Sequence, residues 1–143
     1  MSHIRVLICQ VDEPASDQMT ELAAFDLPAP DIATLRPITA LDDLETLTHE
    51  TGHAILRRVL QAQWDIIDAA LVAQHRQDAF PQSVIADGHE PITVASRFGT
   101  LQLSRQVCQY TGLQTHALPG NAVLPLHRGI IITRGLQEWA LST

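Results

Sequence analysis

The sequence predicts an α+β fold, a single domain over residues 1–143, in which one long amphipathic helix accompanies shorter helices and a β-hairpin. Two patterns favour this class. Apolar residues recur every three or four positions between residues 39 and 77, which is the period of an α-helix. Residues 91–110 instead alternate between apolar and polar side chains on both sides of Phe98-Gly99, as the two strands of a hairpin do.

Residues 1–38 are predicted to form a strand and short helices. The run from Ile4 to Val11 is rich in apolar and β-branched residues, which favours a strand. Ser16 is placed to cap a short helix over residues 17–25. The segment Leu27–Pro30 should end that helix, because proline lacks a backbone donor and restricts the residue before it. Arg36-Pro37 is predicted to end a second short segment.

The segment 39–77 is the strongest helix prediction. Thr39 to Asp42 approximates a capping box, and the acids of the first turns suit the positive end of the helix dipole. The helix would be about 57 Å long at about 1.5 Å per residue. Its apolar face is wide and needs two neighbours, so we expect antiparallel packing or self-association along it, with a break at Gly52 as the alternative. The face consists of two stripes: Leu44, Leu47, Thr51, Ile55, Val59, Ala62, Ile66, Ala69 and Ala73, and Leu56, Leu60, Trp64, Ile67 and Leu71.

The remaining segments are a loop, the hairpin and a short terminal helix. Pro81 and Asp87-Gly88 indicate a loop over residues 78–90. The hairpin over residues 91–110 should pack on the long helix, because a lone hairpin is unstable. Residues 124–143 read as a loop and the start of a helix. The apolar face of that helix lies at the end of the sequence, which predicts a truncated helix and a fragment; docking on its own core is the alternative.

The composition of the chain indicates whether it folds and in which compartment it is found. Apolar residues make up 45% and charged residues 17% of the chain, which argues against disorder. The apolar run at Ile4–Cys9 is too short for a signal peptide or a membrane span. We therefore predict a cytoplasmic protein without a membrane partner, whose two cysteines, Cys9 and Cys108, are buried rather than bridged.

Charge is distributed unevenly, and all nine basic residues are arginine. Residues 1–90 hold five arginines and 15 acids, a net charge of −10, which repels a phosphate backbone. Residues 91–143 hold four arginines and one acid, a net charge of +3. Four arginines are few for a free-standing DNA-binding domain. The alternative is that they are scattered and solvated. The candidate phosphate contacts are Arg97, Arg105, Arg128 and Arg134.

Two stretches of residues 93–143 carry a family resemblance. Arg97–Val107 and Leu124–Trp139 resemble the region just before the catalytic domain in Kra-type insertion-sequence transposases, which belong to the RNase-H-like DDE class. The resemblance implies that a catalytic domain with two metal ions follows this region in the family. It therefore implies an amino-terminal transposase fragment that acts in assembly or in binding transposon ends, without DNA cutting or a cofactor of its own.

A second motif points to different chemistry. His49-Glu50-Thr51-Gly52-His53 places two imidazoles at i and i+4 of a helix, where they could ligate zinc while Glu50 acts as general base. The motif is similar to the zinc-binding helix of gluzincin-like and membrane-associated ATP-dependent metallopeptidases, which implies a small zinc-dependent hydrolase as the alternative function. No second motif supplies a third ligand. His53 also shares a stripe with Leu56 and Leu60, so a half-buried core histidine explains it without metal.

Overall fold

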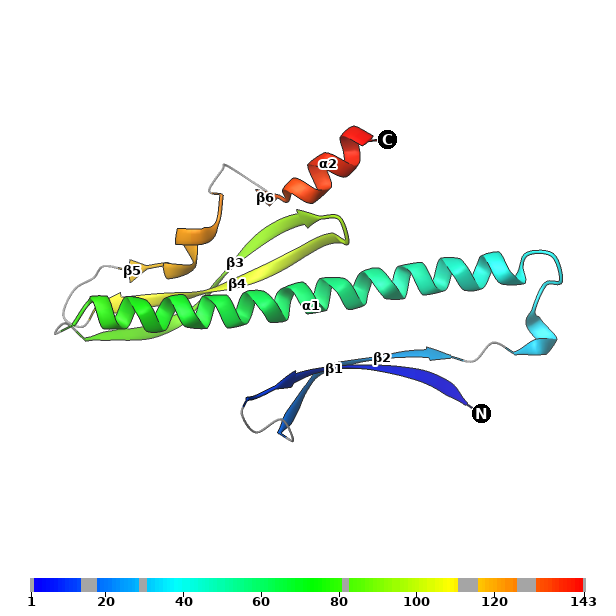
Figure 1. The fold of residues 1–143 in the computed structure, drawn as a ribbon, viewed down its shortest axis with the longest axis horizontal. Helices are drawn as coiled ribbons and strands as arrows, with labels where there is room; N and C mark the ends of the chain where they lie inside the picture. Colours follow the sequence, from blue (N-terminus) through cyan, green and yellow to red (C-terminus); the bar gives the residue numbers. More distant parts are fainter. Residues whose placement is uncertain are drawn as a thin grey trace. The chain divides into compact units, whose positions relative to one another are not determined.

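The computed structural model describes residues 2–13, 18–28, 31–80, 83–110, 116–125 and 131–142. Within these ranges the fold is α+β, with two α-helices and two β-sheets (Figure 1). The chain divides into two compact units, Met1–Val59 and Leu60–Thr143, and the long helix α1 (Ala40–Asp78) runs through the division. The predicted α+β class and the long helix are confirmed, and the protein contains more sheet than the sequence predicted.

The first unit contains an antiparallel hairpin of β1 (His3–Val11) and β2 (Met19–Pro28). The predicted strand at Ile4–Val11 is confirmed. The predicted helix over residues 17–25 is wrong, because residues 19–28 pair with β1 along its whole length. From Ala23 to Leu27 the side chains alternate between half-buried and exposed, which is the period of a strand. The proposed cap, Ser16, lies outside the described residues.

A short 3-10 helix, η1 (Ile32–Thr34), precedes α1. The predicted long helix at 39–77 is confirmed, and α1 continues without a break through Gly52. Its start differs in detail from the predicted capping box. The Thr39 hydroxyl lies 3.4 Å from a carboxylate oxygen of Asp43, which also accepts from Arg36 at 3.1 Å, and no capping-box bond to the Thr39 amide is seen among the described residues.

The second unit contains a four-stranded sheet with the order β5-β4-β3-β6. The hairpin strands β3 (Val84–Ser96) and β4 (Gly99–Tyr110) are antiparallel, β5 (His116–Ala117) joins β4, and β6 (Ile131–Ile132) runs parallel to β3. The predicted hairpin is confirmed but is longer than residues 91–110. The loop predicted over 78–90 is wrong from Val84 onward, because Asp87-Gly88 forms a β-bulge inside β3, where Gly88 has a φ of 86°.

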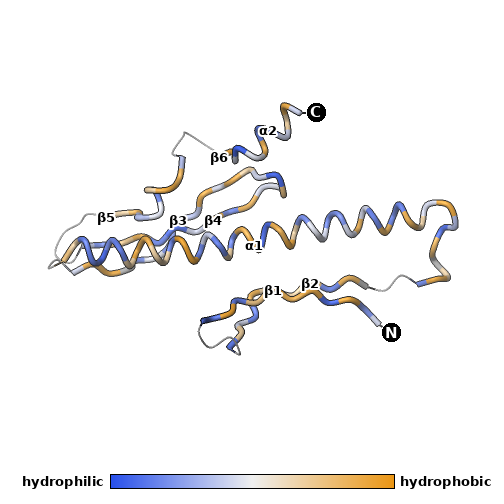
Figure 2. Tube along the Cα trace, in the orientation of Figure 1, coloured by the Kyte–Doolittle hydropathy of each residue, from blue (hydrophilic) through white to orange (hydrophobic). Residues whose placement is uncertain are grey.

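The core of the second unit lies between the hairpin and the part of α1 that follows Leu60. Its buried members come from α1, β3, β4 and β6, and they are Trp64, Val94, Leu101, Leu103 and Ile131. The hairpin therefore packs on the long helix, as predicted. Hydrophobic residues recur along α1 (Figure 2), but those facing away from this core, such as Ile66 at 54% exposure, have no cover among the described residues of the unit.

Two short helices complete the second unit, η2 (Pro119–Val123) and α2 (Arg134–Ser142). The predicted helix start near the end of the sequence is confirmed by α2, on which Leu136 is half-buried and Trp139 is 55% exposed. Both cysteines are free, but only Cys108 is buried. The prediction for Cys9 is wrong, because the exposed face of β1 carries it. Among the described residues, no helix combines the length and hydrophobicity needed to cross a bilayer.

Candidate nucleic-acid interface

The tip of the β3–β4 hairpin holds Arg97 at the surface. The turn residues are Arg97 and Phe98, and Gly99 follows with a φ of 108°, which favours glycine. The buried Ser96 hydroxyl fixes this turn. It donates to the carbonyl oxygen of Gly99 at 2.8 Å and accepts from the Phe98 amide at 3.2 Å. Arg97 is exposed on this fixed turn.

The start of α2 lies against the same tip. Strand β6 pairs with β3 at Val94 and Ala95, and the Thr133 amide then donates to the Ala95 carbonyl at 3.0 Å. The Thr133 hydroxyl caps α2 by accepting from the Leu136 amide at 3.2 Å. In Figure 1, α2 accordingly begins beside the free end of the hairpin. Parallel pairing between residues 94–95 and 131–132 thus brings two segments that are distant in sequence to one place.

Arg97 and the first turn of α2 are in direct contact. A Cβ atom added to Gly135 would lie 2.9 Å from Cδ and 3.4 Å from Cγ of Arg97. The aliphatic part of Arg97 therefore lies against Gly135, next to Arg134 in the chain. The side chain of Arg134 is 90% exposed. Two of the four predicted arginines are thus brought to one exposed corner, at the end of α2 where backbone N–H groups favour anions.

One acidic side chain reduces the positive charge at this corner. The Nε of Arg134 donates to Oε1 of Glu138 at 3.1 Å, one turn along α2. Both side chains are largely exposed, so the pair contributes little to stability. Glu138 is also the one acid of residues 91–143. It is therefore the group that most directly lowers the positive potential at Arg134.

The other two predicted arginines do not join this corner. Arg105 is 7% exposed and belongs to the core side of β4. Its Nη1 donates to the side-chain oxygen of Asn121 at 2.6 Å, and its Nη2 lies near Oε1 of Glu90 and the Pro91 carbonyl. A guanidinium so enclosed offers little surface to a phosphate, and Arg105 is therefore left out of the candidate contact. Arg128 lies outside the described residues.

Arg105 belongs instead to a buried polar cluster that sequence reasoning missed. Asp68, on α1, is 3% exposed, and its Oδ2 accepts from the Gln106 amide at 3.0 Å. Oδ1 of Asp68 and Nε of Arg105 are buried without a hydrogen-bond partner among the described residues. Burial raises the pKa of the Asp68 carboxyl, while the Gln106 amide and Arg105 act in the opposite direction. Such a cluster fixes the packing of α1, β4 and η2.

A small groove lies near this cluster. Its volume is about 280 Å³, slightly below the range of ordinary ligand pockets. Nε2 of His75, one of its lining residues, is 2.9 Å from the Tyr110 hydroxyl, and this hydrogen bond ties the last turns of α1 to β4. The lining residues are Leu71, Gln74, His75, Asp78, Pro119 and Ala122.

The predicted zinc motif lies on the exposed first half of α1. The rings of His49 and His53 have centroids 4.2 Å apart, so the helix does bring the two imidazoles together. His49 and Glu50 are exposed, and His53 is half-buried, as the metal-free interpretation predicted. Within the described ranges, no group of three or more histidine, cysteine or acidic side chains is arranged to hold a metal ion. A catalytic zinc needs three protein ligands and an open position, and the described residues here supply two.

Comparisons with models of protein families, with curated proteins and with solved structures found no match.

Proposed function

We propose that this chain is the amino-terminal, non-catalytic region of an insertion-sequence transposase, and that it contacts transposon DNA through Arg97 and Arg134. The resemblance of Arg97–Val107 and Leu124–Trp139 to Kra-type transposases supports the family. The observation that carries the DNA contact is the packing of Arg97 against Gly135, which joins two exposed arginines at one corner.

The chemistry of the corner suits phosphate oxygens. Arginine donates in a planar fork that matches phosphate, and it keeps its charge at any physiological pH. The corner belongs to the part of the sequence with a net charge of +3, whereas residues 1–90 carry −10. Two phosphate contacts give weak, sequence-independent binding.

The test is duplex binding by the Arg97→Ala/Arg134→Ala double variant, measured by fluorescence anisotropy at low salt. We expect affinity roughly tenfold weaker than that of the parent, which corresponds to ~1.4 kcal/mol. Both side chains are exposed, so the fold should be unaffected. Circular dichroism and the thermal midpoint check this point.

A matched control removes the same charge elsewhere. Arg36→Ala/Arg76→Ala takes away two exposed arginines of α1 and the turn before it. If binding depends on the corner, this control keeps the parent affinity. Equal loss in both double variants would mean that only net charge matters, and unchanged binding in the Arg97→Ala/Arg134→Ala variant would refute the proposed contact.

A further inference from the structure

The two open edges of the β1–β2 hairpin differ in how well they are protected from pairing with another strand. A two-stranded sheet has two edges, and each presents backbone N–H and C=O groups that can pair with a further strand. On β2 the edge is interrupted. Leu22 is an extra, bulged residue between the partners of Ile8 and Cys9, and its carbonyl accepts from Arg58 of α1 at 3.4 Å.

Further features of β2 discourage pairing. The strand carries two acids, Glu21 and Asp26, and ends at Pro28, which has no N–H to donate. Bulges, charges and proline are the devices by which natural sheets protect their edges. The edge of β2 is thus unsuited to another strand.

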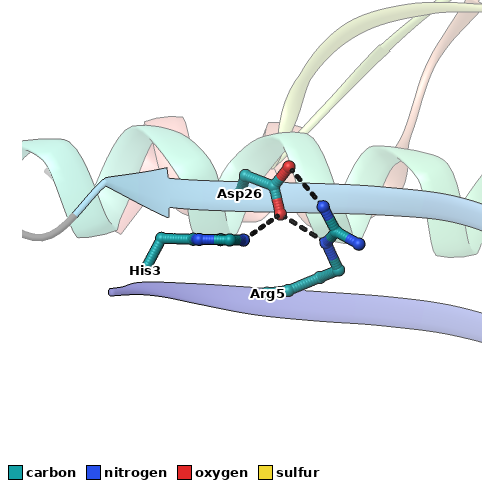
Figure 3. A network of polar contacts seen from close by, with 3 residues as sticks. All are labelled: His3, Arg5 and Asp26. Carbon is teal, nitrogen blue, oxygen red and sulfur yellow. Dashed lines mark hydrogen bonds and ion pairs between the residues drawn. The ribbon is translucent and has the colours of Figure 1, made fainter. Parts of the chain in front are cut away.

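The edge of β1 has no bulged residue and no proline, and its one permanent charge is paired. Its nine residues include no proline and no acid. The one arginine, Arg5, is already paired across the hairpin: Nε donates to Oδ1 of Asp26 at 2.7 Å and Nη2 to Oδ2 at 3.3 Å (Figure 3). His3 lies 3.7 Å from the same carboxylate. The bond from Arg5 holds the pKa of Asp26 below its usual value, so the pair stays ionised. The charge on β1 is therefore compensated within its own hairpin.

One face of β1 is exposed along its length, and beyond His3 and Arg5 it is apolar. Leu7 is 51% and Val11 47% exposed, and Ala24 opposite Leu7 is exposed as well. The opposite face, with Val6 and Ile8, is half-buried. An unprotected strand with apolar side chains on both faces gains more from a further strand than a polar edge strand does.

We propose that β1 pairs antiparallel with β1 of a second copy of this chain, which joins two hairpins into one four-stranded sheet around a two-fold axis. A two-fold axis that keeps the sheet continuous stands perpendicular to it, so the central residue of the strand lies opposite its own copy. For the full overlap of His3–Val11 that residue is Leu7. Arg5 then lies opposite Cys9 and His3 opposite Val11, so no like charges face each other.

This pairing gives a surface and a partner to the assembly that the family resemblance implies, and its biological meaning rests on the proposed function. It differs from self-association along α1, which the length of the helix alone had predicted. The two modes place different residues at the dyad, so they can be told apart by cross-linking.

The test is a disulfide cross-link at the dyad. In a Cys9→Ser background, Leu7→Cys places two thiols opposite each other, within the range of a disulfide. With oxidised glutathione as electron acceptor, we expect conversion to a covalent dimer. Ala24→Cys in the same background is the matched control: in the four-stranded sheet its two copies are roughly 14 Å apart, too far to bridge. Buried Cys108 is common to both variants.

A second set of variants tests the same pairing without depending on disulfide formation. Leu7→Lys puts two ammonium groups face to face at the dyad and should give monomers by size-exclusion light scattering, while mixing it with Leu7→Glu should restore dimers. A dimer that cross-links equally at residues 7 and 24, or not at 7, overturns the pairing. So does a monomeric parent; if that monomer binds DNA normally, the proposed DNA contact stands and only the pairing is lost.

Discussion

Nε1 of Trp64 donates a hydrogen bond of 2.8 Å to the carbonyl oxygen of Ser104, and this bond joins α1 to the centre of β4. The indole is 6% exposed and packs with Val94, Leu101 and Leu103. One side chain thus supplies both the apolar contact and the polar link between helix and sheet in the second unit. The corner that carries Arg97 depends on this sheet.

We expect Trp64→Phe to lower the free energy of unfolding by about 0.5–1.5 kcal/mol, because the hydrogen bond to the Ser104 carbonyl is lost. Trp64→Ala should cost more, about 3–5 kcal/mol, because a cavity is added. Urea denaturation followed by far-UV circular dichroism measures both. Equal stability of the parent and Trp64→Phe would show that the hydrogen bond contributes nothing.

Gly120 lies so close to α1 that no side chain fits. A Cβ atom there would be 2.7 Å from Oδ1 of Asp68 and 3.1 Å from the Trp64 ring. Gly120→Ala should therefore destabilise the fold by about 1–3 kcal/mol through overpacking. Gly52→Ala is the matched control, since no atom lies within 4 Å of its Cβ position, and it should stabilise α1 by about 0.5–1 kcal/mol. In thermal melts, the midpoint should fall for Gly120→Ala and rise for Gly52→Ala.

Asp68 predicts a pH dependence of stability. Burial raises its pKa in the folded state above the ordinary value of 3.8. Between the unfolded and the folded pKa, the folded protein holds a proton that the unfolded chain has lost, so this contribution falls as pH rises through that window. The difference in unfolding free energy between the parent and Asp68→Asn, measured by denaturation from pH 3 upward, should therefore shift in favour of the variant as pH rises. A difference that is constant with pH would contradict the assignment.

The two cysteines should differ sharply in reactivity. Cys108 is fully buried, and burial raises the pKa of its thiol, so little thiolate reaches a reagent. Cys9 is exposed on β1. We expect one rapid alkylation by iodoacetamide in the native protein, located at Cys9 by peptide mass spectrometry, and a second only after denaturation. Rapid labelling of Cys108 in the native protein would show that the hairpin opens readily or is packed differently.

Glu138→Gln should strengthen DNA binding. The substitution releases Arg134 from the ion pair at 3.1 Å and removes the one acid of residues 91–143. Affinity for a duplex should rise about threefold to tenfold at low salt. In an Arg134→Ala background, the same substitution should have a smaller effect, and this double-mutant cycle isolates the coupling. If Glu138→Gln raises the affinity equally with and without Arg134, the rise is due to net charge rather than to release of Arg134.

Local signals predicted the local features of this fold. The length of α1 followed from apolar residues spaced by three and four, and the hairpin turn from Phe98-Gly99. Strand β2 was missed because it is specified by its pairing with β1 rather than by its own sequence, and a nearby serine resembled a helix cap. Gly88 resembled a loop glycine, although it serves a bulge within a strand. Such features depend on partners that a local pattern does not contain.

The candidate site was predicted only in part for the same reason. Arg97 and Arg134 were identified by charge, but their meeting depends on the parallel pairing of β6 with β3. Arg105 was also identified by charge, although alternation along β4 puts it on the same face as Leu101 and Leu103. Asp68 carried a comparable signal: it lies in line with Leu60, Trp64 and Val72 on α1, at a spacing of four that marks a buried position.

The most direct test of the proposed DNA contact is the salt dependence of duplex binding. The slope of log Kobs against log salt counts the phosphates that the protein neutralises, at about 0.9 per contact. If Arg97 and Arg134 each bind a phosphate, the Arg97→Ala/Arg134→Ala variant should show a slope smaller in magnitude than that of the parent by about 1.8. Equal slopes in the parent and the variant would contradict the account and place the contact elsewhere.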